Sequence, residues 1–236
     1  MVFQPIVDVE EGRVVSVEAL ARFAADPPRP PDEWFNEASA AGLSVELEMV
    51  AVDKALASVP LLPPEVAMTV NVGPQTMSNE ALLDSLAGVE PGKVVLELTE
   101  HVGVGDCPRL RSAVQAMRKM GIRLAVDDTG AGISSLTHIV RLAPDFIKLD
   151  RELVKSVDVD PVRQALASCL LNFADKTGAA LIAEGVETGE ELEALRDAGV
   201  RYVQGYYLGR PSSLASFGWA PQPARTETGA VWGAQV

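Results

Sequence analysis

The chain has 236 residues, a formal net charge of −13, 47% hydrophobic residues and 22% charged residues. This length suits one large domain or two small ones, and single α/β barrels commonly reach it. The negative charge disfavours binding to a DNA or RNA polymer or to an anionic membrane surface, since the long-range field repels phosphate groups.

Cysteine and histidine are scarce, with Cys107, Cys169, His101 and His138 as their only members. That number excludes a disulfide framework and a metal site built on several histidines, and we expect both cysteines to fill the core. No apolar run approaches the ~20 residues of a membrane span, and the N-terminus does not resemble a signal peptide. We therefore expect a cytoplasmic location and no membrane span in this chain.

Eight short apolar runs indicate strands, and helical patterns follow most of them. In chain order they are FQPIVDV (3–9), VVSVEALARF (14–23), AMTVNV (67–72), KVVLEL (93–98), RLAVDD (123–128), FIKLD (146–150), ALIAEG (180–185) and YVQGYY (202–207). This alternation favours an α/β fold, a (β/α)8 TIM-like barrel, over an open doubly wound sheet. Only about four residues separate the first two runs, which is too few for a parallel crossover but enough for a hairpin. The first strand is therefore predicted to run antiparallel to the rest.

Three helices have clear boundaries in the sequence. The first covers residues 106–120 and ends at Gly121. A second begins at Asp160 and ends at Gly178, and a third begins at a capping box of Thr188 and Glu191. The second helix carries one apolar stripe that consists of Val162, Leu166, Cys169, Leu170 and Phe173.

We find no domain boundary inside the barrel, which is expected to span residues 1–215. The strand and helix pattern decays from about Ser212 onward. Residues 216–236 are therefore predicted to form a C-terminal tail or linker that is partly flexible.

Polar residues end nearly every predicted strand. In chain order they are Glu18, Asn71, Glu97, Asp127 with Asp128, Lys148, Glu184 and Gln204. Because barrel enzymes carry their reacting groups at the C-terminal ends of the strands, these side chains should meet at one mouth. The reversed first strand would bring Gln4 to the same mouth. Converging carboxylates repel one another unless they are protonated or bind cations, and oxygen ligands favour Mg²⁺ or Mn²⁺.

The adjacent pair Asp127 and Asp128 could bridge two ions ~3.5 to 4 Å apart, as in the hydrolysis of phosphate esters. Lys148 and Arg22 would then supply positive charge. Each residue alone has a simpler interpretation: the aspartate pair as a turn or helix cap, Lys148 as an ion-paired lysine, and Glu97 as an edge-strand charge. Their recurrence at strand ends favours a site.

The segment TGAGISS (129–135) follows the two aspartates. Such a loop can bring backbone N–H groups to an anion or close over a site, although it lacks the Lys-Ser/Thr ending of a P-loop. The alternative is a flexible linker into the next helix. Glu100 could hold this loop in place, or it could be a carboxylate at a helix N-terminus.

Eight motifs in order carry a family resemblance over residues 3–211: FQPIVD, EALARF, NVGP, ELTE, DDTGAGISSL, FIKLD, AEGVET and QGYYLGRP. With them the sequence resembles the EAL domain family of bacterial cyclic di-GMP phosphodiesterases, named for the tripeptide found here at residues 18–20. The family fold is a barrel with an antiparallel first strand. The resemblance implies metal-dependent hydrolysis of one phosphodiester bond of cyclic di-GMP, which gives linear pGpG and lowers the level of this second messenger.

The resemblance also implies roles for individual residues. The ligands of one ion would be Glu18, Asn71, Glu97 and Asp127, and those of a second ion Asp127 and Asp128. Glu184 resembles the acid near the second ion that is often assigned as the base, and Lys148 the lysine that orients the attacking water. Gln204 matches a residue of the water network, and Glu187 an acidic position near the site. The positions that hold the dinucleotide would be Gln4, Leu20 and Arg22.

Departures from the family pattern are local. The loop after the aspartates has Thr129, Ala131 and Ile133 where the family usually has Phe, Thr and Tyr, and Gly73 replaces Ser or Asn. Because this loop is thought to couple dimerisation to metal binding in the family, turnover or its regulation is expected to differ.

Family precedent also implies a homodimer. It further implies a longer protein with an upstream sensory or cyclase domain, and a membrane tether for that protein is compatible with the sequence. Two other functions stay open from the sequence: a receptor that binds cyclic di-GMP without hydrolysing it, and a protein-interaction module. The complete set of acidic ligands favours the enzyme.

Overall fold

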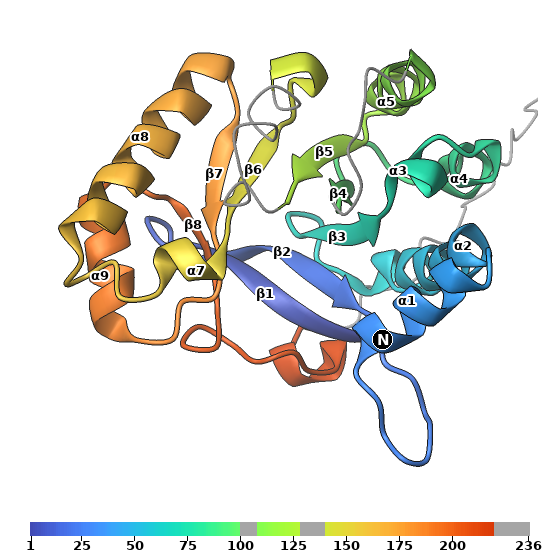
Figure 1. The fold of residues 1–236 in the computed structure, drawn as a ribbon, viewed down its shortest axis with the longest axis horizontal. Coiled ribbons are helices and arrows are strands. Elements are labelled where there is room, and N and C mark those ends of the chain that lie inside the picture. Colours follow the sequence, from blue (N-terminus) through green and yellow to red (C-terminus); the bar gives the residue numbers. More distant parts are fainter. Residues whose placement is uncertain (100–107, 128–139, 220–236) are drawn as a thin grey trace, which may run out of the picture.

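A computed structural model of the chain describes residues 1–99, 108–127 and 140–219. Eight strands close into a barrel in sequence order (Figure 1). They are β1 (Val2–Asp8), β2 (Arg13–Leu20), β3 (Ala67–Val72), β4 (Val94–Leu98), β5 (Arg123–Val126), β6 (Phe146–Leu149), β7 (Ala180–Ala183) and β8 (Tyr202–Gln204). Each predicted strand run contributes one of them, so the predicted fold class is confirmed.

Strand β1 runs against both of its neighbours. It pairs antiparallel with β2 and β8, whereas the other neighbouring strands pair in parallel. The predicted hairpin is therefore confirmed. Gln4 lies opposite Glu18 in the β1–β2 register, so the reversal brings the N-terminal half of β1 to the barrel end where β2 finishes.

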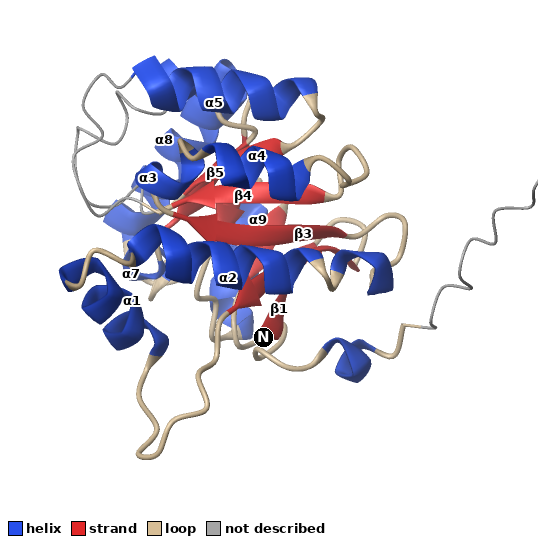
Figure 2. Cartoon of the chain, turned by 90° about the vertical axis from the view of Figure 1, so that its right-hand side faces the viewer, coloured by secondary structure: helices blue, strands red, loops and turns tan. Residues whose placement is uncertain are grey.

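Helices surround the barrel, and Figure 2 shows α2, α4 and α5 over the outer side of β3, β4 and β5. The α-helices are α1 (Pro31–Ala40), α2 (Ser44–Leu56), α3 (Pro74–Met77), α4 (Glu80–Leu86), α5 (Pro108–Lys119), α7 (Arg151–Val154), α8 (Pro161–Thr177) and α9 (Gly189–Asp197). Two short 3-10 helices are η1 (Val59–Leu61) and η2 (Leu214–Phe217). None of the helices in the described ranges is long and apolar enough to cross a bilayer.

The two-residue period of the strands decides which side chains reach the barrel interior. In β4, Leu96 and Leu98 belong to the large apolar cluster that includes side chains of the surrounding helices. Val95 instead packs with Ala67 and Ala125 in a separate small cluster. Glu97 stands two residues after Val95 and therefore shares its face, at the interior of the barrel.

The helix boundaries agree with the caps in the sequence. Asp160 accepts hydrogen bonds from the first backbone N–H groups of α8, and Gly178 ends this helix with a φ of 77°. Thr188 and Glu191 form the capping box of α9. The sequence predicts these helix ends correctly because helix capping depends on residues that are adjacent in the sequence.

The inward stripe predicted for α8 is partly wrong. Leu170 is buried, but Val162 is 74% exposed, Leu166 is 39% exposed and Cys169 is exposed rather than a core residue. The buried face is completed by the small residues Ala167 and Ala174, which let the helix lie close to the barrel. The structure describes the first residues of the predicted tail, 216–219, and in them Phe217 stacks on Trp219. Cys107 and residues 220–236 lie outside the described ranges.

Asp8 closes the end of the barrel opposite to Glu18. Its carboxylate is 1% exposed and accepts hydrogen bonds from the backbone N–H groups of Glu10 and Glu11, at 3.0 and 3.1 Å. Arg201 donates to the other carboxylate oxygen from Nε at 2.8 Å. Burial would raise the pKa of Asp8, but these hydrogen bonds hold it below its usual value.

We expect Asp8→Asn to lower the free energy of unfolding by about 1–3 kcal/mol, because the amide turns an N–H group toward Arg201. A depressed folded-state pKa means that Asp8 contributes stability above its unfolded pKa of about 3.9 and loses it as the pH falls through the folded value. Urea unfolding from neutral to acid pH should therefore show the gap between wild type and variant shrinking. A gap that is constant with pH would contradict this account.

Candidate active site

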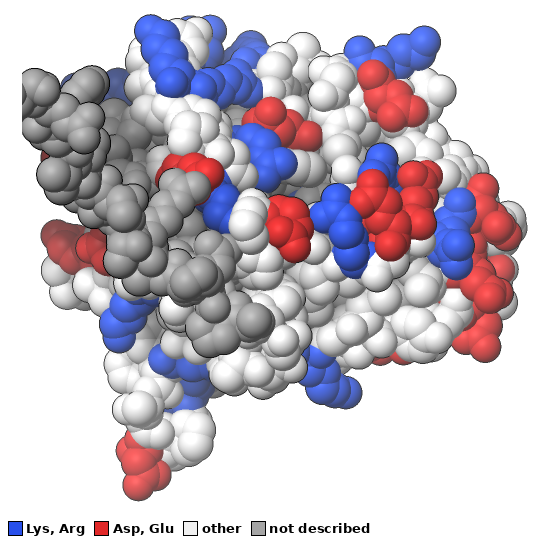
Figure 3. Space-filling model, turned by 180° about the vertical axis from the view of Figure 1, so that it is seen from behind, with Lys and Arg blue, Asp and Glu red and all other residues white. Residues whose placement is uncertain are grey.

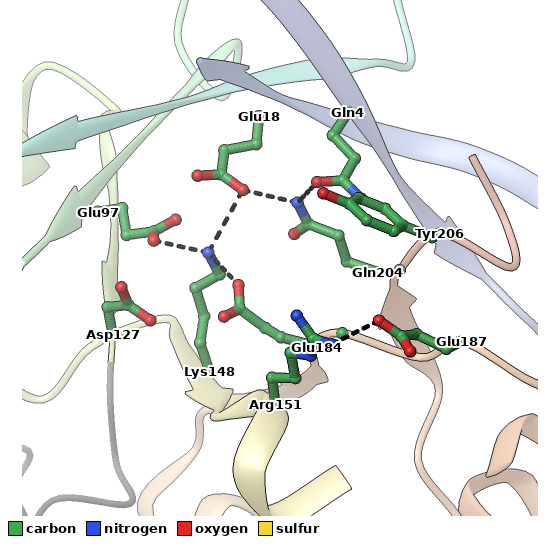
Figure 4. Close-up of a pocket in the computed structure, with 12 residues that line it drawn as sticks. Gln4, Glu18, Glu97, Asp127, Lys148, Arg151, Glu184, Glu187, Gln204 and Tyr206 are labelled. Carbon is green, nitrogen blue, oxygen red and sulfur yellow. Dashed lines mark hydrogen bonds and ion pairs between the residues drawn. The ribbon is translucent and has the colours of Figure 1, made fainter. Parts of the chain in front are cut away.

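A cavity of about 230 Å³ opens at the end of the barrel where the parallel strands finish. Side chains from seven of the strands, or from the residue directly after a strand, line it, and Figure 4 shows them pointing toward one another. These side chains are Gln4 from β1, Glu18 from β2, Glu97 from β4, Asp127 after β5, Lys148 from β6, Glu184 after β7 and Gln204 from β8. The predicted convergence of polar strand ends is thus observed for these residues.

Lys148 lies at the centre of this group and is 1% exposed. Its ammonium is 2.6 Å from Glu97 Oε1 and 3.7 Å from Glu18 Oε2, and it also contacts Glu184 Oε1. Burial alone would lower the pKa of Lys148, but the surrounding carboxylates raise it well above its usual value. The lysine is therefore charged and partly compensates the acidic cluster.

Glu18 has the most complete set of partners. Asn71 Nδ2 donates to its Oε1 at 2.7 Å, and Gln204 Nε2 donates to its Oε2 at 2.6 Å. Burial would raise the pKa of this carboxyl, but the Lys148 ammonium and the two hydrogen bonds keep it below its usual value. Gln204 Nε2 is also 3.2 Å from Gln4 Oε1, so both glutamines are fixed in the wall of the cavity.

Three of the carboxylates lie close together. One oxygen each of Glu97, Asp127 and Glu184 lie within 4.8 Å of one another. Burial raises the pKa of Glu97 well above its usual value and that of Glu184 to about 7, although Lys148 opposes both shifts. Glu97 Oε2 is buried and has no hydrogen-bond partner in the described part of the chain. Carboxylate oxygens in this arrangement fit a hard divalent cation, which would relieve the repulsion and engage that oxygen.

The backbone beyond Asn71 is fixed by a carboxylate from α2. Gly73 N donates to Glu48 Oε2 at 2.7 Å. A Cβ atom at position 73 would lie 2.9 Å from Glu48 Oε1, so this carboxylate fills the space that a side chain would need. Gly73, which stands where the family usually has Ser or Asn, therefore makes a specific contact with Glu48 close to the end of β3.

The structure does not bring every predicted residue to the cavity. Strand β2 ends at Leu20, and Arg22 is exposed and donates to the carbonyl of Ala21 at 2.7 Å. Neither Leu20 nor Arg22 lines the cavity. The predicted strand of residues 14–23 thus ends three residues early, and Arg22 does not add its charge to the cavity wall. Glu187 does line the cavity, at its rim.

Several predictions fall outside the described ranges. They concern Asp128, Glu100 and the loop residues Thr129, Ala131 and Ile133. Conversely, four lining residues were not among the predicted site residues: Arg151, Gly185, Gly205 and Tyr206. Gly185, Gly205 and Tyr206 stand one or two positions beyond a predicted site residue, and Arg151 stands three positions beyond Lys148.

Comparison with known proteins agrees with this geometry. A family model described as EAL domain matches residues 1–211. The probable cyclic di-GMP phosphodiesterase PdeN of Escherichia coli is 30% identical over 239 residues, which cover 94% of this chain and 45% of that protein. The cyclic di-GMP phosphodiesterase NbdA of Pseudomonas aeruginosa is 30% identical over 227 residues, which cover 91% of this chain and 29% of that protein. The chain thus spans less than half the length of these relatives.

Solved structures match over most of the chain. The manganese and cyclic di-GMP complex of Klebsiella pneumoniae BlrP1 at pH 6 has a TM-score of 0.79 and 33% identity, and covers 89% of this chain and 55% of its own. The PaMucR phosphodiesterase in complex with c-di-GMP has a TM-score of 0.81 and 27% identity, and covers 92% of this chain and 97% of its own. With the family model matching nearly the whole barrel, the chain belongs to the EAL domain family.

Proposed function

We propose that this domain hydrolyses one phosphodiester bond of cyclic di-GMP to give linear pGpG, with Mg²⁺ or Mn²⁺ as its cofactor. The observation that carries the proposal is the group of Glu97, Asp127 and Glu184, whose carboxylate oxygens converge within 4.8 Å beside a buried lysine. The names of the relatives and the manganese and cyclic di-GMP complex of BlrP1 support the same chemistry.

In this proposal two ions are held by Glu18, Asn71, Glu97, Asp127, Asp128 and Glu184. When bound, such a pair of ions lowers the pKa of a water molecule and neutralises phosphoryl oxygens. Lys148 keeps the carboxylates together and orients the water through its ammonium group. Gln204 holds Glu18 in position, and Gln4 and Gln204 form the wall beside it.

Glu184 is the proposed general base. In the metal-free domain burial raises the pKa of this carboxylate to about 7, and the side chain lies in the cavity beside Lys148. The water oxygen bonds to phosphorus, one P–O bond to a ribose oxygen breaks, and the water proton passes by way of Glu184 to the leaving oxygen. The ring opens with one phosphomonoester and one remaining phosphodiester.

The substrate is proposed to be a small dinucleotide rather than a DNA or RNA polymer. On the face drawn in Figure 3, basic side chains stand beside acidic ones rather than in a continuous basic surface. Together with the net charge of −13, this mixed surface gives no electrostatic support for a polyanion. Binding of Leu20 and Arg22 to the dinucleotide stays a prediction, because the structure places neither in the cavity wall.

The homodimer, the upstream sensory or cyclase domain, the cytoplasmic location and the membrane tether also stay predictions. PdeN and NbdA are longer than this chain, which leaves room for further domains in such proteins. Sedimentation of the purified domain with and without Mn²⁺ would test the dimer.

A time course with the purified domain, cyclic di-GMP and Mn²⁺ tests the proposed reaction. Chromatography should show pGpG accumulating, EDTA should stop its formation, and Glu18→Ala should lower the rate by more than about 100-fold because the ligand set is broken. Glu193→Ala, on the exposed side of α9, is the matched control and should behave like wild type. Tight binding without product would identify a receptor, and the absence of both nucleotide and metal binding would leave an interaction module.

A further inference from the structure

Two basic side chains line the cavity, and they stand in different surroundings. The side chain of Lys148 is 2% exposed and is enclosed by carboxylates. That of Arg151 is 55% exposed and stands at the rim (Figure 4). Of the cations in the cavity wall, Arg151 is therefore the one that can reach a ligand group lying outside the acidic cluster.

The backbone directs Arg151 toward the rim. Arg151 is the first residue of α7, and Asp150 caps this helix by accepting from Glu152 N at 2.6 Å. The aliphatic stem of Arg151 crosses Gly185, where a Cβ atom would overlap it. Gly185 also has a φ of +69°, which favours glycine, so the strand end that carries Glu184 leaves room for the arginine.

One carboxylate holds the guanidinium without using all of its donors. Arg151 Nη2 donates to Glu187 Oε1 at 2.7 Å, and in the described part of the chain this is the one hydrogen bond of the guanidinium. The backbone N–H of Glu187 is itself fixed by Glu191 Oε2 at 2.9 Å, and Glu191 also accepts from Ser156 N. Because a guanidinium carries five N–H donors, Arg151 keeps a free edge for a second anion.

The charged side chains of the cavity wall indicate which anion would bind to this free edge of Arg151. The wall of the cavity holds five carboxylates and two cations, and four of the carboxylates belong to the proposed ion site. Outside that site the charged side chains of the wall are Arg151 and Glu187, so Arg151 is the cation that a second phosphate would meet. A cyclic dinucleotide carries two phosphodiesters, and only one of them can react at a time. We propose that Arg151 binds the second, non-reacting phosphate through its free guanidinium edge, the geometry in which arginine binds phosphate best. This inference rests on the proposed function.

Arg151→Ala is expected to weaken the binding of cyclic di-GMP about tenfold and to raise KM by a similar factor, with kcat within about twofold. Arg151→Lys, which keeps the charge but not the planar fork, should fall between wild type and Arg151→Ala. Calorimetry in Ca²⁺ gives the dissociation constant, because BlrP1 has a calcium and cyclic di-GMP complex. Arg13→Ala is the matched control: it removes an arginine of similar exposure, paired with Glu11, at the opposite end of the barrel.

A substrate with a single phosphodiester, bis(4-nitrophenyl) phosphate, locates the contact. Its kcat/KM should change little in Arg151→Ala, because it has no second phosphate. Equal losses on both substrates would place Arg151 at the reacting phosphate and overturn the proposal, as would cyclic di-GMP binding in Arg151→Ala that matches Arg13→Ala. If wild type neither binds nor hydrolyses cyclic di-GMP, the proposed function itself fails and this inference fails with it.

Discussion

Lys148→Met is expected to lower the free energy of unfolding of the metal-free domain by about 3–5 kcal/mol, because it leaves buried carboxylates without their cation. The ammonium contacts Glu97, Glu184 and Glu18, and it is almost fully buried. The loss should be larger at about pH 8 than at about pH 5, since the carboxylates can protonate at lower pH. Denaturant unfolding at both pH values measures it.

A second substitution separates charge from packing in this experiment. Glu18→Gln removes one negative charge at nearly constant volume, because the pKa of Glu18 lies below its usual value, so the double variant Lys148→Met with Glu18→Gln should recover part of the lost stability. Mn²⁺ should also stabilise Lys148→Met more than it stabilises wild type, because a bound cation replaces the missing charge. Equal stability of Lys148→Met and wild type at both pH values would show that the lysine does not compensate the cluster.

Glu97→Gln is expected to lower kcat/KM for cyclic di-GMP by more than about 100-fold, while the metal-free domain keeps its stability within about 1 kcal/mol. The stability should be kept because the pKa of Glu97 is raised well above its usual value, so the native carboxyl is already costly to ionise. Activity should be lost because Gln offers a neutral oxygen in place of a carboxylate to a divalent cation. Steady-state kinetics and denaturant unfolding of the same preparation check both halves.

Calorimetric titration of Mn²⁺ into Glu97→Gln gives a readout that does not depend on turnover. The variant should bind Mn²⁺ at least about tenfold more weakly than wild type. Glu80→Gln, on the exposed start of α4, is the charge-matched control and should keep both affinity and activity. Wild-type activity in Glu97→Gln would remove this residue from the proposed site.

The barrel and much of the site could be predicted because both follow from local rules. Strand period places Glu97 and Lys148 on interior faces, and parallel strands bring their ends to one mouth. The short connection between the first two strands predicted the antiparallel β1, which brings Gln4 opposite Glu18. These inferences need only the sequence spacing of residues along each strand.

Other features depend on contacts that sequence spacing does not encode. The apolar residues of α8 span a wide arc, and the sequence alone could not tell that Leu170 lies at the centre of the buried face while Val162 is exposed. The strand that carries Glu18 ends at Leu20 rather than at Phe23, a boundary error of three residues that leaves Arg22 outside the strand and outside the cavity wall. Arg151 reaches the rim because of the backbone at Gly185, which is distant in sequence.

The most direct test of the central claim is ³¹P NMR of cyclic di-GMP incubated with the domain and Mg²⁺. The two phosphates of the substrate are equivalent and give one phosphodiester resonance. Hydrolysis of one bond should replace it with one phosphodiester and one phosphomonoester signal of equal intensity, and EDTA should prevent the change. A phosphodiester resonance that persists unchanged with an excess of Mg²⁺ and active, folded protein would contradict the proposed hydrolysis.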